Sequence, residues 1–421
     1  MFFALKDRAL TAVVAGFLLL ALPAGPTFAS PTVLEVTGTQ LPSLSPVSLE
    51  RLAVLACKRG DCRPVPFQVD ERTADNQWAL PDGPKPIFDD PPGVFDENDL
   101  LLWMADDAGE ELTDPAALPP HDAAVAVEVT AAGGKIRRWI YIVACLGEPP
   151  RSVTRYVQYD PTADLMRGAR VGMGFRDGIP DRLLALGPGD TNLLDRFKIR
   201  ARATLIWGLL GFSRDEGDLE TELIGWQQGP IRIIRYQRQR VRLGWGIRSP
   251  VFAVYTFFTR DYAELPVALW LNHPPTWFFT DIQLDLLLDF RDLSGWQLEL
   301  PKPLLPRQIG GPPVESVEPI AGDWFGLRGP QMTLLVALHL GESLQSVRHR
   351  VLYRSGGEAA PPEDVPGERP AVGYRLDQWE PVGAGGHALK AVAYALPSDT
   401  DLDGFMDRGA RAAVGSILPV R

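Results

Sequence analysis

The sequence predicts a mainly β protein, built from antiparallel sheets in sandwich or barrel domains. Basic and apolar residues alternate between residues 197 and 206, which is the period-two pattern of a strand with one buried and one exposed face. Strand-length segments follow, separated by glycine or polar turn residues as in an antiparallel meander, at 219–226, 230–245, 251–260 and 264–272. Strong helical periodicity is scarce, so we expect few helices.

Residues 1–29 have the composition of a secretory signal peptide. Lys6 and Arg8 precede an apolar run over residues 10–22, and small residues surround a cleavage point after Ala29. The alternative is an uncleaved anchor, but the run is shorter than the roughly 20 residues of a spanning helix. We therefore expect a periplasmic or secreted protein without a transmembrane span.

The overall composition fits a folded protein of that kind. A hydrophobic content of 45% and 11 tryptophans supply a large core, and the formal net charge of −11 argues against nucleic acid as a partner. This average hides segregation along the chain. Aspartate and glutamate crowd residues 70–114 and 399–407, whereas arginine dominates residues 196–242.

Connections rich in proline and glycine divide the mature chain into three expected regions. Residues 30–150 form short apolar runs between proline-rich connections and are expected to be an N-terminal β domain. Residues 151–310 contain the meander and are expected to form a central antiparallel sheet domain. Residues 311–421 are expected to be a C-terminal β region that ends in an acidic loop.

The 3 cysteines predict one disulfide bond. Cys57 and Cys62 flank a four-residue turn between two strand-like segments, and facing positions in a hairpin lie close enough for a bridge. An oxidising compartment would permit it, with two free thiols as the alternative. Cys145 ends an apolar strand and is expected to be a free, buried thiol.

Two arginine sets suggest a basic face. Arg200 and Arg202 alternate on one predicted strand, and three more arginines alternate on another: Arg238, Arg240 and Arg242. Such faces can hold an anionic polymer, because guanidinium groups pair with carboxylates. The alternative is an exposed sheet face whose arginines are simply solvated.

An acidic motif near the C-terminus predicts a structural calcium ion. Four aspartates stand at positions 1, 3, 5 and 9 of one segment: Asp399, Asp401, Asp403 and Asp407. Gly404 at position 6 permits a sharp turn, and the carbonyl of Phe405 at position 7 can add a ligand. Four like charges this close repel one another unless a cation neutralises them. The alternative is a solvated acidic turn.

The aspartate segment resembles the calcium loops of thrombospondin type-3 repeats, dockerins and EF-hands, over about nine residues. It departs from the EF-hand and dockerin pattern at position 12, where Ala410 replaces the last acidic ligand. Residues 65–70 and 96–105 loosely resemble N-terminal β modules attached to some secreted polysaccharide lyases. Asp96, Asn98 and Asp99 in the second segment could also ligate a hard cation.

The sequence leaves two functional classes open. It has no glycine-rich phosphate loop, His-Glu-x-x-His or Gly-x-Ser-x-Gly motif, and its 5 histidines are far apart. His339, in an apolar strand, is expected to be a hydrogen-bonded core residue. The first class is a non-catalytic binding protein for an anionic glycan or another protein. The second is a carbohydrate-active enzyme, such as a polysaccharide lyase or a glycoside hydrolase, because arginine can neutralise a uronate while tyrosine or histidine moves a proton.

Overall fold

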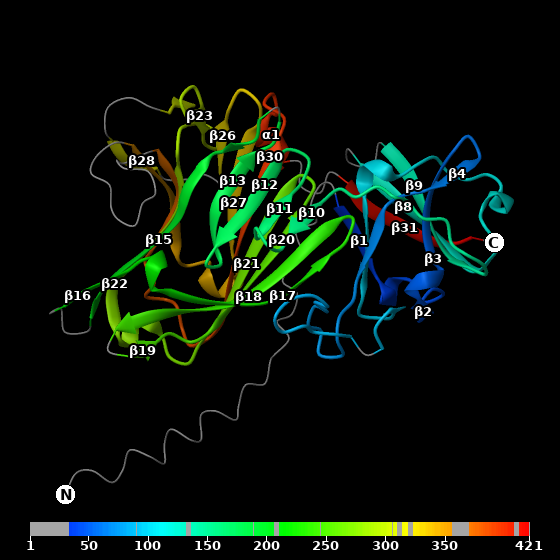
Figure 1. Cartoon of the computed structure of the whole chain (residues 1–421). Coiled ribbons are helices and arrows are strands. Elements are labelled where there is room, and N and C mark those ends of the chain that lie inside the picture. Colours follow the sequence, from blue (N-terminus) through cyan, green and yellow to red (C-terminus); the bar gives the residue numbers. More distant parts are fainter. Residues whose placement is uncertain are drawn as a thin grey trace, which may run out of the picture.

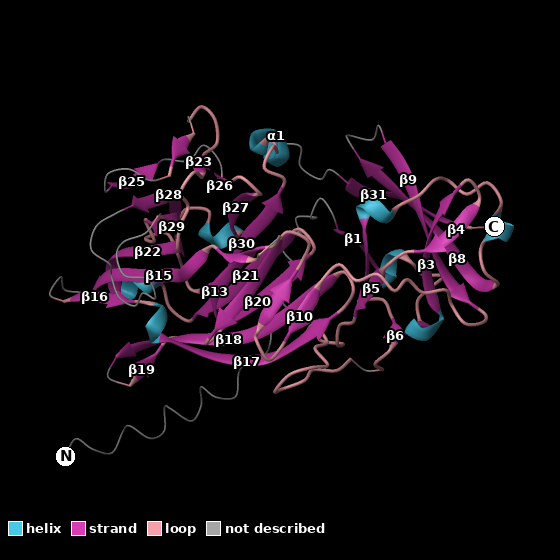
Figure 2. Ribbon diagram, turned by 45° about the horizontal axis from the view of Figure 1, so that its top comes forward, coloured by secondary structure: helices cyan, strands magenta, loops and turns pink. Residues whose placement is uncertain are grey.

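The computed structural model describes residues 33–89, 91–131, 136–187, 189–205, 210–244, 246–304, 306–309, 314–318, 323–355, 370–407 and 412–420. The expected signal peptide lies outside these ranges. Within them the chain is mainly antiparallel β, as predicted, with one α-helix, α1 (Leu402–Asp407) (Figures 1 and 2). None of the helices described there has the length and apolar character needed to cross a bilayer.

Three sheets form the N-terminal unit on the right of Figure 1. The first has the order β1 (Val33–Thr37), β7 (Leu100–Met104), β5 (Phe67–Asp70). The second has the order β31 (Ala412–Pro419), β8 (His121–Ala131), β9 (Ile136–Cys145), β3 (Leu52–Lys58), β4 (Asp61–Pro64). The third pairs β2 (Val47–Ser48) with β6 (Val94–Phe95). Strand β31 comes from the end of the chain, so the C-terminal segment completes the N-terminal unit.

The larger body contains three further sheets. A small sheet has the order β10 (Gln158–Asp160), β11 (Leu165–Arg167), β12 (Val171–Arg176), β13 (Ile179–Ala185), β14 (Thr191–Asn192). A six-stranded sheet has the order β16 (Gly211–Arg214), β15 (Leu194–Leu205), β22 (Phe279–Phe290), β29 (Ala371–Asp377), β28 (Arg348–Ser355), β25 (Val314–Glu318). A ten-stranded sheet has the order β17 (Leu219–Gln228), β18 (Arg232–Gly244), β20 (Phe252–Thr259), β21 (Tyr262–Leu271), β30 (Gly385–Leu396), β27 (Thr333–Leu340), β26 (Trp324–Arg328), β23 (Gln297–Glu299), β24 (Arg307–Gln308), with β19 (Ile247–Arg248) beside β18.

Short 3-10 helices connect several strands of the described chain. They are η1 (Gly38–Gln40), η2 (Leu49–Arg51), η3 (Ala105–Asp107), η4 (Pro115–Ala117), η5 (Glu216–Asp218), η6 (Pro275–Trp277) and η7 (Glu342–Leu344). The sheets do not follow the sequence regions 151–310 and 311–421. Both large sheets take strands from each region, because β21 pairs with β30 and β22 pairs with β29.

The predicted hairpin disulfide is present. Cys57 and Cys62 face each other across the β3–β4 hairpin, with their Cα atoms 4.0 Å apart, and are bonded. Cys145, at the end of β9, is free and buried, also as predicted. Burial raises the pKa of its thiol, which keeps it protonated and unreactive.

Strand β18 shows the alternation that its sequence predicts. Its odd-numbered side chains point into the sandwich, where Ile233 joins the core. Arg235 donates two hydrogen bonds to Asp164, at 2.9 and 2.7 Å, and Gln237 donates to the carbonyl of Gly178 at 2.7 Å. The even-numbered side chains lie on the opposite surface of the ten-stranded sheet, which we call the outer face.

The N-terminal unit packs against one part of that outer face. Leu102 and Met104 of β7 are buried in one cluster with Tyr262 and Val392 of the large sheet. Beside this apolar contact, Asp70 of β5 is fully buried and pairs with Arg232 of β18. The side-chain carbonyl of Gln68 accepts hydrogen bonds from the backbone of Ile231 and Arg232, at 3.0 and 2.9 Å. Apolar contact and a buried ion pair therefore join the two units.

Candidate functional site

A row of large polar and aromatic residues crosses the outer face next to the N-terminal unit. Pairing places Tyr236 of β18 opposite Tyr255 of β20, and Lys390 of β30 opposite both Pro266 of β21 and His339 of β27. The register between β20 and β21 sets Tyr255 opposite Pro266. Four strand-to-strand steps therefore lead from Tyr236 to His339. At about 4.8 Å between neighbouring strands, they span roughly 19 Å. We call this set the Tyr255–His339 row.

A row of small residues runs parallel to it. Ala253, Ala268 and Ala388 face one another across β20, β21 and β30, and Arg238 of β18 lies at one end. Ala388 is exposed. On the far side, Trp270 is 51% exposed, and its ring lies against Gly386, the residue opposite it on β30. The small-residue row is therefore flanked by taller side chains on both sides.

The aromatic part of the site is rigid and carries a guanidinium group. The rings of Tyr236 and Tyr255 stack with centroids 4.3 Å apart and planes 8° from parallel. The Nε of Arg238 donates to the hydroxyl of Tyr236 at 3.1 Å. Phe257 extends the stack on the side of the N-terminal unit, 5.9 Å from Tyr255.

The N-terminal unit contributes Arg72 to the edge of this site. Its guanidinium carbon lies 3.9 Å from the centre of the Trp78 ring, and Trp78 in turn meets Phe257 edge to face at 5.4 Å. The Nε of Arg72 is buried and donates no hydrogen bond. Burial and the charge of Arg232 lower the pKa of Arg72. A buried donor of this kind favours an approaching anion.

Protonation differs along the Tyr255–His339 row. Burial lowers the pKa of His339, and the charge of Lys390 lowers it further, so the imidazole is neutral at pH 7. Burial raises the pKa of Tyr255, so its hydroxyl stays protonated. Lys390 lies 3.5 Å from the carboxylate of Glu264, whose pKa burial also raises. The row therefore presents a lysine, a neutral imidazole and a phenol.

The sequence predicts only part of this site. Arg238 was expected on a basic face, but His339 was assigned to the core; it is half-buried, on the outer face. Tyr255, Lys390 and Arg72 were missed. The alternation of side chains along a strand predicts which face of its own strand Tyr255 or His339 occupies. No sequence pattern shows that β21, β30 and β27 are neighbours in the sheet.

The five arginines of the expected basic face lie in two different sheets. Arg200 of β15 is largely buried and pairs with Glu216, whereas Arg202 on the same strand is exposed. Both belong to the six-stranded sheet. The set does not form one continuous surface.

The β18 arginines share the outer face, as predicted from their spacing. The Nε of Arg240 donates to Glu220 of β17 at 2.7 Å, and Arg248 pairs with the same carboxylate at 2.9 Å. Arg242 donates to the carbonyl of Gly217. Their charge is thus partly balanced within the protein, and Arg238 is the one beside the tyrosines.

The aspartates of the expected calcium loop surround the start of α1. The Oδ1 of Asp401 accepts from the backbone of Gly404 at 3.2 Å, in the manner of a helix cap. Asp403 pairs with Lys302 at 3.2 Å, and the Phe405 ring lies 5.2 Å from that of Tyr394. Asp399 adds to the negative field around Arg328. The side chain of Asp407 lies outside the described part, and calcium binding here stays a prediction.

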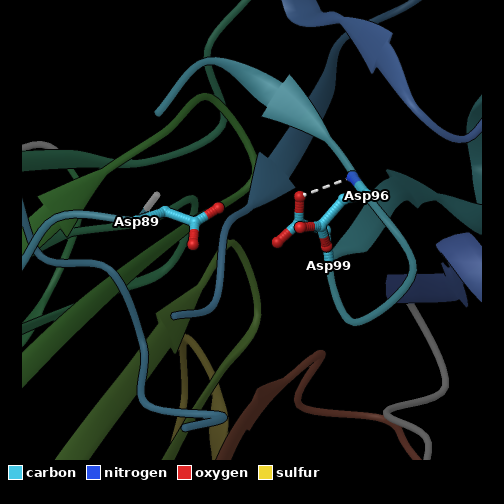
Figure 3. A group of neighbouring side chains, drawn as sticks. All are labelled: Asp89, Asp96 and Asp99. Carbon is cyan, nitrogen blue, oxygen red and sulfur yellow. Dashed lines mark hydrogen bonds between the residues drawn. The ribbon is translucent and has the colours of Figure 1, made fainter. Parts of the chain in front are cut away.

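A second acidic group lies in the N-terminal unit (Figure 3). Carboxylate oxygens of Asp89, Asp96 and Asp99 lie within 4.8 Å of one another, which suits a hard cation. In the ranges described, this is the one group of three such residues with metal-binding spacing. Asp99 accepts from the backbone of Arg72 at 2.7 Å and of Asp96 at 3.0 Å, and burial raises its pKa to about 7.

No protein-family model and no curated protein matches this chain. An alpha-mannosidase from Enterococcus faecalis V583 has a TM-score of 0.46 at 8% identity, and the match covers 92% of this chain. This chain spans only 44% of that mannosidase chain. The structure of HI1317 has a TM-score of 0.31 at 9% identity, covering 57% of this chain and 98% of that one. Both scores are below 0.5, so neither likeness carries an argument about function.

Proposed function

We propose that this chain is an extracytoplasmic binding protein for an anionic glycan, held on the outer face of the ten-stranded sheet. The observation that carries the proposal is the pair of adjacent rows, one of small residues and one containing Tyr255, Lys390 and His339. Sugar rings can lie on the small residues, against the ring of Trp270 on one side and Tyr255 on the other.

The charges beside these rows favour an acidic ligand. Arg238, Arg72 and Lys390 come from three separate segments and surround the same part of the sheet. The negative charge of Glu264 offsets the charge of Lys390, with which it pairs, but Glu264 does not pair with Arg238. Carboxylates of a uronate chain would receive charge-assisted hydrogen bonds from these groups, which are about twice as strong as neutral ones.

Titration with an oligogalacturonate at low and high salt tests this proposal. We expect binding that weakens as the ionic strength rises, because the pairs at an open face are screened over about 10 Å at 0.1 M salt. A neutral oligosaccharide of equal length serves as the control and should bind much more weakly. Equal binding of both polymers would contradict an electrostatic role.

Binding should strengthen as the pH falls from 7.5 to 5. The lowered pKa of His339 leaves it neutral at pH 7, and protonation in acid adds a positive charge beside Lys390. An anionic ligand binds the protonated form better, so affinity increases as the pH falls toward that pKa. The raised pKa of Glu264 acts in the same direction, because its negative charge is lost in acid. Calorimetric titrations of wild type and His339→Gln measure the effect, and an unchanged pH profile in the variant would assign it to other groups.

We also propose that calcium stabilises the C-terminal segment through Asp399, Asp401, Asp403, Asp407 and the carbonyl of Phe405. A calcium ion would draw these carboxylates together in the folded chain and not in the unfolded one, so binding would favour the folded state. Millimolar calcium should raise the melting temperature of wild type but not of the Asp401→Ala, Asp403→Ala variant. Asp96→Asn is the matched control for the other acidic group. A calcium effect lost only in Asp96→Asn would move the ion to that group.

A second candidate function is β-elimination of a uronate polymer, as in a polysaccharide lyase. It is favoured by one observation: neutral His339 lies opposite Lys390, and protonated Tyr255 stands in the same row on the other side of Pro266. His339 could take the proton next to the carboxylate while Lys390 neutralises that carboxylate, and water could protonate the glycosidic oxygen as its bond to the neighbouring carbon breaks. An unsaturated product would absorb in the ultraviolet. No absorbance increase with any polyuronate would leave binding as the function.

A further inference from the structure

A pocket of about 400 Å³ lies away from the outer face. It is bounded by the β12–β13 turn, the start of β15, η5 and the start of β17. Thr221 lines it, and the hydroxyl of Thr221 accepts from Gln239, whose side chain lies on the inner side of β18. The pocket is therefore on the side of the sheet opposite Tyr255.

One buried carboxylate in the pocket has an oxygen without a hydrogen bond. Glu216 is 2% exposed, and its Oε2 accepts from Arg200 and from the backbone of Ile199 at 3.1 Å. Its Oε1 accepts none, and Arg196 lies 3.8 Å away, beyond hydrogen-bond distance. A buried acceptor without a donor is uncommon and costs roughly 1–3 kcal/mol. A ligand with a donor would remove that cost.

The charges of the pocket favour a neutral donor. Glu216 is already paired with Arg200 and, at 3.8 Å, with Arg196. Asp181 pairs with Arg176 at 3.1 Å, and Asp195 has Arg291 at 3.6 Å. An additional charge of either sign would be desolvated beside ions that already have partners. A hydroxyl group donates without adding charge.

Part of the pocket wall is apolar. Ile179, Pro180 and Leu219 line it together with the charged residues. A pyranose has the matching chemistry, because its C–H groups can contact the apolar wall while its hydroxyls meet carboxylates and guanidinium groups. The volume is in the range of small-molecule sites, which hold such ligands in about 300–1,000 Å³.

We propose that this pocket is a separate binding site for a neutral, polyhydroxylated ligand of about one hexose unit, with a hydroxyl donating to Oε1 of Glu216. The ligand differs in charge from the glycan of the outer face. The two sites lie on opposite sides of one sheet, so binding at one can be disproved without affecting binding at the other.

The test uses the full mature chain with glucose, mannose and myo-inositol as probes, followed by ligand-detected NMR and calorimetry. Glu216→Gln keeps the shape of the side chain and replaces one acceptor with an amide donor. It should weaken probe binding tenfold or more. Leu219→Trp fills the pocket from its half-exposed wall and should abolish binding. Oligogalacturonate binding should survive in both variants.

Two results would overturn the proposal. One is that no probe binds wild type at millimolar concentration. The other is that probe binding persists in Leu219→Trp. If Glu216→Gln melts at a much lower temperature than wild type, Leu219→Trp alone decides. Arg240→Gln, on the outer face, is the matched control and should leave probe binding unchanged.

Discussion

Asp70→Ala is expected to lower the free energy of unfolding by roughly 3–5 kcal/mol. Asp70 is fully buried between the N-terminal unit and the ten-stranded sheet, where its carboxylate accepts from Arg232 and, at 2.5 Å, from Gln68. Its removal leaves a buried guanidinium group whose remaining ion pair, among the described residues, is with Glu35 at 3.5 Å. Denaturant unfolding monitored by tryptophan fluorescence measures the loss.

The control for this prediction is Asp122→Ala. Asp122 also pairs with an arginine, Arg51, but the two side chains are 52% and 41% exposed. Ion pairs at such positions contribute roughly 0–1 kcal/mol. The two substitutions should therefore differ severalfold in their effect. Similar losses in both variants would show that the Asp70 pair does not fasten the two units together.

Removing the positive charges beside the rows should abolish glycan binding. The double variant Arg238→Gln, Lys390→Gln takes away two charge-assisted contacts, each worth roughly 1.5–3 kcal/mol. The sum corresponds to a loss of affinity of roughly 100-fold or more. Arg238 is exposed, but the Lys390 side chain is 17% exposed and pairs with Glu264, so the melting temperature of each single variant is measured beside its affinity. Calorimetric titration with an oligogalacturonate measures the affinity.

The matched control is Arg240→Gln. Arg240 is also exposed on the outer face of β18, but it is paired with Glu220 and lies one outward position further along the strand. Its replacement should change affinity less than threefold. Equal losses of affinity on replacing Arg238 and on replacing Arg240 would indicate a diffuse basic surface, as the sequence suggests, and not a defined site.

Local pattern was enough to predict much of this fold. The period-two alternation in β18 and the cysteines that flank the β3–β4 turn depend on residues close in sequence, and both predictions are confirmed. Register between distant strands is different, because it depends on which hydrophobic surfaces meet in the folded chain. Thus the return of β31 to the N-terminal unit and the pairing of β21 with β30 were not predictable.

The candidate site depends on that distant register. Lys390 and His339 become neighbours only because β30 inserts between β21 and β27. Arg200 and Arg238 look equivalent in the sequence, yet one pairs with buried Glu216 and the other lies beside Tyr236. Burial and partners, which the sequence does not contain, separate a structural arginine from one that can meet a ligand.

The most direct test of glycan binding on the outer face uses a variant in which the small-residue row is blocked. Ala388 is exposed in the middle of the sheet and contributes only a methyl group, so Ala388→Trp should fold normally while covering the row. Ala116→Trp, at an exposed position of η4 in the N-terminal unit, controls for the added ring. We expect oligogalacturonate to bind wild type and Ala116→Trp alike and to fail to bind Ala388→Trp. Undiminished binding to Ala388→Trp would place the glycan elsewhere and contradict the account.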